Sequence, residues 1–573
     1  MSIIGLLKAN CKHCYKCLKE CPVKSIQVID GQAKIIEKSC VLCGRCLLTC
    51  PQQAKTVQSD LGMVREWIAG GERVAVSLAP AFTGSFDGTG KQMVSALLKL
   101  GFDKVSETAL GAAYVSTEFA RLVREKKMEH IITSCCPVVN DYIEKHHPDM
   151  IPYLAPVVSP MIAHGTLLHQ QLGEEEKVVF IGPCIAKKAE AIDIRHPNAI
   201  DAVLTFDDLN VWFREAGINP AEMEETPFFN ADPSIARMFP VPGGVNDTVK
   251  HLLGDEVNGN HYNFLDVTGL TNCGELFDAI RHGDMQHCFV ELNACVGGCT
   301  GGPARAENAH SRFESRLRVT DRSRRSSKTF PQTPVNLPLH KTFTDRSEKE
   351  DLPSEAVIRA ILAKTGKETP EQELNCGMCG YPSCREKAIA VFQGKAELNM
   401  CIPFMRERAE SMAHIVLASS PNITIIVDQD LNITEFNAAA EKKFGLSRRE
   451  ALTKCIFEIM DCSDFQFVLE NHQPINDKRV TLKEYDMTAL MSIVYIPEND
   501  MAMGIFKDIT DEVAREEAHY KMRVDTVEMA QKVIDKQMAV AQQIASLLGE
   551  TTAETKVTLT KLKNIIVYEG NEK

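Results

Sequence analysis

The chain of 573 residues predicts about four domains at roughly 150 residues each, and its 44% hydrophobic and 25% charged residues are typical of a globular protein. The formal charge of −13 repels phosphate groups and argues against a nucleic acid partner. Because no apolar run reaches the roughly 20 residues that span a bilayer, we expect a cytoplasmic protein without a membrane span.

Cysteine is the residue type that stands out, with 21 copies. In a reducing compartment these thiols are not expected to form disulfides, so their spacing decides between metal ligands and core residues. The first fifty residues contain an internal repeat, in which a run of four cysteines recurs 29 residues later and each run ends in Cys-Pro.

Each run has the spacing C-x2-C-x2-C-x3-C-P, which is typical of iron-sulfur ligand loops. Three thiolates of one tight loop hold three corners of a 4Fe-4S cubane, and the fourth thiolate ligates the other cluster. Zinc would instead favour two pairs of ligands. Residues 1–58 resemble a bacterial two-cluster ferredoxin. The first cluster would be held by Cys11, Cys14, Cys17 and Cys50, and the second by Cys40, Cys43, Cys46 and Cys21.

Residues 59–310 form the next predicted domain. From residue 73 to residue 303, apolar segments such as 74–78 and 178–181 alternate with helical patterns such as 91–100, which predicts an α/β domain. Residues 304–347 then carry ten Lys or Arg against four Asp or Glu. We predict a solvated basic linker over residues 311–349, on or beside the preceding domain, in preference to an anion-binding patch.

A second cysteine set lies in the short segment 350–410, with the spacing C-x2-C-x4-C-x16-C. Zinc is one possible occupant. The string CGMCGYPSC, however, resembles the small 4Fe-4S modules of electron-transfer subunits, and this resemblance implies a third accessory cluster. Its ligands would be Cys376, Cys379, Cys384 and Cys401.

Residues 411–512 resemble a PAS domain, through SSPNITIIVDQDLNITEFNAAAEKKFGLSRREALTKC and the later GIFKDIT. The ligand of this domain is unknown. We expect His472 at the surface, and Cys455 and Cys462 as core thiols rather than ligands. The tail 513–573 has apolar residues in 3-4 spacing and predicts a heptad-like helix. Such a helix either packs on its own protein or forms a homodimer, and we favour the homodimer.

Three cysteine-bearing segments lie in the central domain: TSCCP at 133–137, GPCIAKKAE at 182–190 and ELNACVGGCTGGP at 291–303. A single buried thiol is usually an ordinary core residue, as we expect for Cys273 and Cys288. Four cysteines from separate loops, with glycines that let the backbone approach, suit a buried inorganic centre instead.

These three segments resemble the signature motifs of the FeFe hydrogenases, TSCCPxW, MPCxxKxxE and ExMACxxGCxxGGGQP, over about residues 60–310. The resemblance implies an H-cluster, which is a 4Fe-4S cluster joined to a diiron subsite with CO, CN and azadithiolate ligands. It also implies that Cys299 bridges to the diiron subsite. The ligands of the 4Fe-4S part would be Cys136, Cys184, Cys295 and Cys299.

The resemblance also implies roles for neighbouring residues. Lys187 would hold a cyanide ligand of the subsite through a charge-assisted hydrogen bond. Cys135 would relay protons, and Glu118 would be the next relay step. Glu190 would be either a salt-bridging carboxylate or one that supports the ligands from behind.

Several positions depart from the motifs. Gly182 and Asn293 replace methionines, Val139 replaces the tryptophan, Met161 alters a neighbouring SPQQ-like segment, and Ala155 lacks an expected hydroxyl. Changes around the ligands shift potential and turnover, and the missing hydroxyl argues against the usual proton channel. These departures resemble the sensory and poorly characterised branches of the family more than the fast hydrogen-evolving enzymes, although Cys135 is retained.

The sequence therefore predicts a multidomain α/β and α+β protein. We interpret it as an FeFe hydrogenase that interconverts H2 with protons and electrons, of a sensory or low-turnover type coupled to PAS signalling. Expected partners are a ferredoxin or similar electron carrier, hydrogenase maturation proteins, and a kinase or phosphatase output partner. One alternative is a non-catalytic Fe-S redox-sensing signalling protein. Another is a cluster-assembly protein, against which Lys187 and Cys135 weigh because neither is needed to hold a cubane.

Overall fold

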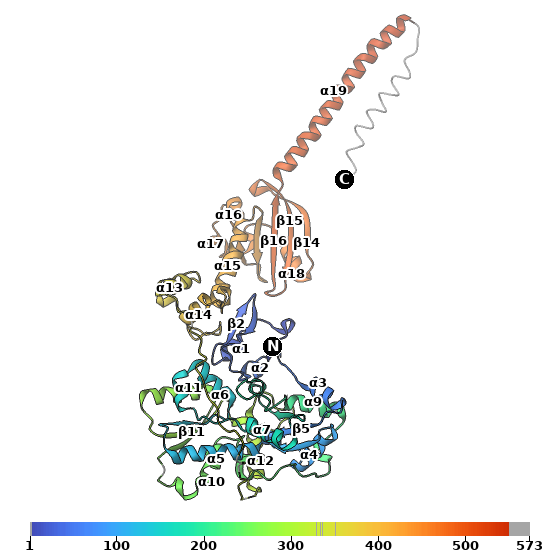
Figure 1. Ribbon diagram of the computed structural model, residues 1–573. Helices are drawn as coiled ribbons and strands as arrows, with labels where there is room; N and C mark the ends of the chain where they lie inside the picture. The colour runs from blue at the N-terminus through green and yellow to red at the C-terminus, as the bar shows by residue number, and fades with distance from the viewer. Residues whose placement is uncertain are drawn as a thin grey trace. The chain divides into compact units, whose positions relative to one another are not determined.

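The computed structural model describes residues 3–548 except 260, 328, 333, 335 and 350. Two compact units divide between Phe404 and Met405 (Figure 1). The first contains the ferredoxin-like segment, the central domain and the short cysteine segment, and the second contains the PAS-like region. Among the described residues, no helix is both long and apolar enough to cross a membrane.

The N-terminal segment converts the sequence repeat into a repeated loop and helix. The helices α1 (Lys16–Glu20) and α2 (Arg45–Leu48) each follow a residue in the left-handed conformation, Tyr15 and Gly44, and each carries the third cysteine of its run. Two antiparallel strand pairs frame them: β1 (Ile4–Leu6) with β4 (Lys55–Val57), and β2 (Ile26–Ile29) with β3 (Gln32–Ile35).

The central domain contains two parallel sheets, as expected for α/β alternation. Strands β5, β9 and β11 are buried along their whole length, because helices cover both faces of the sheets. The first sheet has the order β6 (Lys104–Glu107), β5 (Val74–Leu78), β8 (Lys177–Gly182), β9 (Ala202–Thr205). The second has the order β10 (Asn263–Thr268), β11 (Cys288–Asn293), β7 (Ile131–Ile132).

Helices connect and cover these strands. The α5 and α7 helices cross closely at Gly111, where an added Cβ would lie 2.3 Å from the Pro160 carbonyl oxygen. The helices of this domain are α3 (Leu61–Ala69), α4 (Gly90–Lys99), α5 (Ala109–Glu125), α6 (Pro137–His146), α7 (Pro160–Leu172), α8 (Ala186–Ala191), α9 (Phe206–Ala216), α10 (Gly244–Leu253) and α11 (Leu270–His282).

A buried histidine ties α7 to the first sheet. The Nδ1 atom of His164 lies 2.7 Å from the Ser77 hydroxyl of β5, and its Nε2 atom lies 2.9 Å from the Ser106 hydroxyl of β6. Burial lowers the pKa of His164 to about 3. This imidazole is therefore neutral near pH 7 and fills two hydrogen-bonding positions inside the domain.

The basic segment 311–349 lies on the central domain, but part of it is less solvated than its composition predicts. It contains α12 (Arg312–Arg324), which packs on the central domain with Val319 buried. The Arg322 guanidinium lies 2.8 Å from the buried Glu107 carboxylate and stacks 4.7 Å from the centre of the Phe82 ring. The basic charge is thus partly neutralised inside the fold, which charge counting along the chain does not show.

The short cysteine segment consists of α13 (Glu355–Ala363) and α14 (Cys384–Phe392) with the loop between them. It packs against the N-terminal segment, where the Val28 amide donates to the Lys395 carbonyl at 2.9 Å. A shared apolar cluster joins the two through Leu18 of α1 and Tyr381.

The second unit is built on one five-stranded antiparallel sheet. Figure 1 shows β14, β15 and β16 side by side, and Phe436, Phe465 and Phe506 are buried in the core beside the sheet. The strands in sheet order are β13 (Ile433–Phe436), β12 (Ile423–Val427), β16 (Met501–Asp508), β15 (Met487–Ile496) and β14 (Ile475–Leu482). The helices are α15 (Ile402–Ser419), α16 (Ala438–Phe444), α17 (Arg448–Ala451), α18 (Ser463–Asn471) and α19 (Thr510–Leu548).

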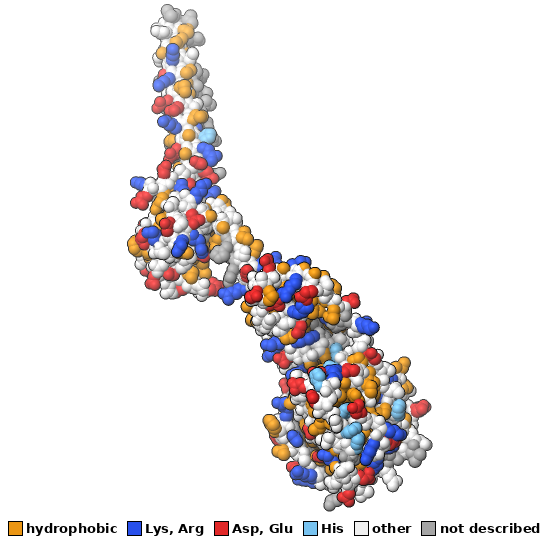
Figure 2. All heavy atoms as spheres, turned by 90° about the vertical axis from the view of Figure 1, so that its left-hand side faces the viewer, with side chains coloured by type: hydrophobic (Ala, Val, Ile, Leu, Met, Phe, Trp, Pro, Cys, Tyr) orange, Lys and Arg blue, Asp and Glu red, His pale blue; other side chains and the backbone are white. Residues whose placement is uncertain are grey.

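The structure tests two predictions for the C-terminal region, the surface position of His472 and the tail helix. His472 is exposed and stacks on Tyr495 with 4.1 Å between ring centres, as expected for a surface residue. The predicted tail helix is α19, along which hydrophobic side chains lie among charged ones (Figure 2). Residues 549–573 of the predicted helix lie outside the described residues.

Candidate functional site

The strands of both parallel sheets end at one cavity of about 940 Å³. Its wall is formed by residues that directly follow β5, β6 and β8 of the first sheet and β7 and β11 of the second. Loops after the carboxyl ends of parallel strands are where such sheets place ligands. The fold therefore brings TSCCP, GPCIAKKAE and ELNACVGGCTGGP together, although they are distant in the sequence.

Five thiols line this cavity, those of Cys135, Cys136, Cys184, Cys295 and Cys299. Burial raises the pKa of the Cys184 thiol to about 11 and that of the Cys299 thiol to about 12. Iron bound to such a thiol would displace its proton, and soft thiolate ligands are those that iron-sulfur clusters take. The donor set therefore fits the predicted cluster ligands and also includes Cys135.

Lys187 lies at the same wall, at the start of α8. Its ammonium group lies 2.5 Å from the Glu190 carboxylate and donates to the Ser159 hydroxyl at 3.0 Å. Although burial alone would lower the pKa of Lys187, the Glu190 carboxylate raises it above its usual value. Because an ammonium group has three N–H donors, one remains for a group in the cavity. Glu190 forms the salt bridge that we expected.

Glu118 is not brought to this cavity. Its carboxylate pairs with the Arg121 guanidinium at 2.8 Å on the outer side of α5 and does not line the cavity wall. The next residue, Phe119, and Leu122 face the core and are buried. The helical period thus turns the acid away from the site, and its expected place as the next proton relay after Cys135 is not supported by the structure.

Glu291 is a cavity residue to which sequence analysis gave no role. Burial raises its pKa to about 7. Its carboxylate accepts hydrogen bonds from the backbone amides of Val245 and Asn246 at the start of α10, at 2.9 and 3.1 Å, and from the Asn293 side chain at 2.9 Å. The only signal in the sequence was its place as the first residue of the third motif.

The N-terminal thiols approach in the crossed arrangement that we predicted for the second cluster. Burial, with a smaller contribution from the neighbouring Cys21, raises the pKa of Cys43 and Cys46 to about 12. The fourth thiol of the first run therefore lies near the second run. In the described residues, no three His, Cys, Asp or Glu side chains are arranged to hold a single metal ion. The fit of clusters rests on donor chemistry and on the cavities.

The second run also touches the loops of the cavity. Gly44 has φ of +71°, and an added Cβ would lie 2.5 Å from the Pro303 ring and 2.9 Å from the Ile185 side chain. Ile185 directly follows Cys184. Cys43, Cys136 and Cys184 also pack against one apolar cluster. A cluster on the second run would thus be the neighbour of a cluster in the cavity.

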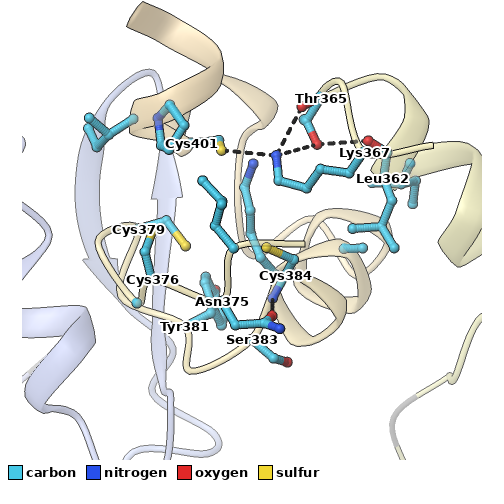
Figure 3. A pocket seen from close by; sticks show the side chains of 17 residues that line it. Leu362, Thr365, Lys367, Asn375, Cys376, Cys379, Tyr381, Ser383, Cys384 and Cys401 are labelled. Carbon is cyan, nitrogen blue, oxygen red and sulfur yellow. Dashed lines mark hydrogen bonds between the residues drawn. The ribbon is translucent and has the colours of Figure 1, made fainter. Parts of the chain in front are cut away.

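A separate pocket of about 500 Å³ is lined by Cys376, Cys379, Cys384 and Cys401 (Figure 3). The Asn375 side chain accepts a hydrogen bond from the Cys384 amide at 2.7 Å and so orders the loop. The four predicted ligands of the third cluster are therefore gathered at one place.

The comparisons agree with these sites. Residues 72–303 match the family model "Iron only hydrogenase large subunit, C-terminal domain". Residues 372–403 match the model of an Fe-S cluster family. Two parts of the chain are thus similar to the C-terminal domain of the iron-only hydrogenase large subunit and to an Fe-S module.

Three curated relatives illustrate the similarity. Iron hydrogenase 1 of Clostridium pasteurianum is 26% identical over 288 residues, which are 40% of this chain and 50% of the relative. The periplasmic [Fe] hydrogenase large subunit of Nitratidesulfovibrio vulgaris is 28% identical over 260 residues, 37% and 62% of the two chains. Cytosolic iron-sulfur assembly component 3 of Rattus norvegicus is 26% identical over 280 residues, 39% and 59%. The matched region spans only about half to three fifths of these relatives.

Solved structures show partial likeness. The apo form of the [FeFe]-hydrogenase HydA1 of Chlamydomonas reinhardtii, solved as a single-residue variant, gives a TM-score of 0.42 at 20% identity and covers 51% of this chain and 100% of its own. The C-terminal region has PAS-like neighbours. The PAS domain of an HTR-like protein from Haloarcula marismortui gives a TM-score of 0.16 at 21% identity and covers 18% of this chain and 95% of its own.

Proposed function

We propose that this chain is an FeFe hydrogenase that interconverts H2 with protons and electrons, as a sensory or low-turnover type coupled to its PAS-like region. The observation that carries this proposal is the cavity in which Cys135 and Lys187 accompany the four cluster thiols. An H-cluster bound there would supply an open metal position for heterolytic cleavage of H2.

The protein side chains would hold and surround this group. Its thiolate ligands would be four cysteines that line the cavity, Cys136, Cys184, Cys295 and Cys299. The free N–H of Lys187 can donate to an anionic ligand, while Glu190 and Ser159 hold the ammonium in place. Burial raises the pKa of Cys135, so this thiol keeps its proton at the cavity wall.

The accessory clusters would carry electrons. The second N-terminal run lies against the cavity loops, and the third pocket lies against α1. We therefore propose three further 4Fe-4S clusters and a ferredoxin or similar carrier as the external electron partner. Hydrogenase maturation proteins would assemble the diiron subsite. We also propose a homodimer formed through the PAS-like region and α19, and a kinase or phosphatase as output partner.

A second candidate is a redox-sensing signalling protein without turnover. The position of Glu118 favours it, because the structure leaves the expected proton relay after Cys135 without its next acid. A role in cluster assembly, as the name of the Rattus norvegicus relative states for that protein, is less consistent with Lys187 and Cys135, since holding a cubane requires neither.

The decisive experiment is infrared spectroscopy in the carbonyl and cyanide stretching region, on protein matured anaerobically, with and without H2. Bands that shift with H2 would support the hydrogenase proposal. Absence of bands, with accessory iron present and a known hydrogenase matured in the same cells, would reject it in favour of the redox-sensing candidate. Protein from cells without maturation proteins is the control.

A further inference from the structure

The pocket of the third cysteine set contains two buried lysines beside its thiols. The Lys367 ammonium lies 3.3 Å from the Cys401 sulfur and donates to the Thr365 carbonyl at 2.9 Å (Figure 3). The Lys387 ammonium donates to the Leu398 carbonyl at 2.9 Å. Both lysines line the pocket, and each is only 6% exposed.

Among the described residues, these lysines lack acidic partners. Throughout the described part of the chain, neither forms an ion pair with a carboxylate, and the pocket wall there contains no Asp or Glu. A buried ammonium without an opposite charge is costly. The counter-charge available in the pocket is that of the four cysteine sulfurs, once they are thiolates bound to iron. The pocket therefore suits a group with net negative charge.

The same arrangement affects the electron affinity of such a group. Reduction adds one negative charge to a 4Fe-4S cluster, and nearby positive charge and N–H donors to the sulfurs stabilise that form. Lys367 supplies both effects at Cys401, and Lys387 supplies a second positive charge. A cluster in this pocket would therefore have a higher reduction potential than it would with neutral neighbours.

A short contact connects this pocket with the N-terminal segment. The Lys24 ammonium donates to the Gly380 carbonyl at 3.0 Å and to the Leu18 carbonyl at 3.2 Å. Gly380 has φ of +93°, and an added Cβ would lie 3.0 Å from Leu18. Gly380 follows Cys379, and Leu18 lies between Cys17 and Cys21. The pocket thus adjoins the first N-terminal cysteine run through Lys24 and Leu18.

We propose that the third cluster is the terminal electron store of this chain, that Lys367 and Lys387 raise its reduction potential, and that it is filled through the N-terminal segment. The step is a one-electron transfer, in which an N-terminal cluster is oxidised and the third cluster is reduced, without making or breaking a bond. Oxidation of one H2 releases two protons and two electrons. One electron fills the store, and the other passes to another accessory cluster or to the external carrier.

This inference rests on the Fe-S clusters of the proposed function, and a redox titration can test it without hydrogen turnover. Its place in the chain matters, because Cys401 directly precedes α15, the helix that leads into the second unit. The electron store would lie at the residue where the chain enters that unit.

The test is a dithionite redox titration of the anaerobic full-length protein, followed by electron paramagnetic resonance. A Cys376→Ser variant identifies the signal of the third cluster by its loss. Lys367→Met removes the charge and the donor to Cys401, whereas Lys367→Arg retains a charge. Lys364→Met is the matched control, because Lys364 is exposed at the end of α13.

At the wild-type midpoint potential, we expect Lys367→Met to lower the ratio of reduced to oxidised third cluster at least tenfold, a negative shift of about 59 mV for one electron. Lys367→Arg should shift it less, and Lys364→Met should leave it unchanged. An unchanged midpoint in Lys367→Met would overturn the proposal, as would a wild-type third cluster that is reduced only after the N-terminal clusters.

Iron content distinguishes a third cluster that is absent from wild-type protein from one that is lost only in the variant. If wild-type protein holds iron for only the N-terminal clusters and the cavity, the third cluster itself is absent and the inference fails together with that part of the proposed function. If Lys367→Met loses its cluster, Lys367→Gln keeps an N–H donor without a charge. A midpoint of Lys367→Gln equal to that of wild type would then reject the role of the charge.

Discussion

The N-terminal segment and the central cavity both gather cysteines, but they do so in opposite ways. In the N-terminal segment, three thiols of each run come from a single tight loop next to a short helix. In the cavity, Cys136 and Cys295 come from loops after different strands of the second sheet, and Cys184 comes from a loop of the first sheet. The first site is local in the sequence, and the second exists only after both sheets have formed.

This difference predicts which substitutions would disrupt each site. A local loop needs little beyond its own spacing, whereas the cavity depends on every element that positions its walls. Arg322 of α12, which stacks on Phe82 near the cavity, and His164, which ties α7 to β5 and β6, are such elements. Changes in the central domain should therefore affect the cavity and spare the N-terminal clusters.

The largest effect is expected for Cys299→Ser. Loss of this thiolate should abolish the infrared bands of the diiron subsite while iron bound by the N-terminal segment persists, because the two sites share no ligand. Infrared spectra and iron content of the matured protein check this. Cys288→Ser is the control, since Cys288 is buried but does not line the cavity. Survival of the bands in Cys299→Ser would contradict the bridging role.

Cys135→Ala should leave iron content unchanged and slow proton-coupled turnover about 10² to 10⁴-fold, the usual contribution of a positioned proton-transfer group. Hydrogen uptake measured with an artificial electron acceptor gives the rate. The matched control is Cys273→Ala, a buried thiol outside the cavity wall. A parallel fall in iron content would show that Cys135 is a ligand instead.

Arg322→Met should lower the free energy of unfolding of the central domain by about 3 kcal/mol, as expected when a buried ion pair loses one partner. This loss of unfolding free energy should be near the lower end of the range for buried ion pairs, because the Arg237 guanidinium still donates to the Glu107 carboxylate at 2.9 Å. Denaturant unfolding of the full chain measures it. Arg324→Met, at a side chain 76% exposed, should have little effect. Equal stability of the two variants would restore the solvated-linker interpretation of segment 311–349.

His164 predicts a smaller, pH-dependent effect. Its pKa is lowered by burial to about 3 in the folded protein, against about 6.5 in an unfolded chain. Between these values the unfolded state binds the extra proton, so its stabilising contribution is present above pH 6.5 and is lost as the pH falls toward 3. The slope is at most about 1.4 kcal/mol per pH unit.

Denaturant unfolding at a series of pH values checks this, with His164→Gln as the test variant and the exposed His472→Gln as its control. The pH dependence between pH 6.5 and 4 should be weaker in His164→Gln than in His472→Gln. Identical pH profiles would mean that His164 does not stay neutral inside the domain.

The sequence alone was sufficient where ligands are local. The spacing of Cys40, Cys43 and Cys46 predicts one loop around one cluster, and in the structure Cys21, the predicted fourth ligand, lies near Cys43 and Cys46. The α/β alternation of the central domain was likewise predicted, because strand and helix periods are properties of neighbouring residues.

Motif resemblance assigned roles to more residues than cysteine spacing did, but it could not predict the direction in which their side chains point. It assigned Lys187 to the cavity, where the structure also provides its partners Glu190 and Ser159. It assigned Glu118 as a relay, and the structure turns that carboxylate to Arg121 instead. A helix position decides its face only once the helix has packed, and one residue separates Glu118 from the buried Phe119.

By itself, the sequence predicted the thiol ligands and the family that the central domain resembles, because both predictions depend on short motifs. The tertiary structure alone decided that α12 folds onto the central domain through Arg322 and Glu107, and that Lys367 faces Cys401 without a carboxylate partner in the described residues. The physical reason is that the burial and the pairing of a charged side chain depend on which segments, distant in the sequence, pack around it.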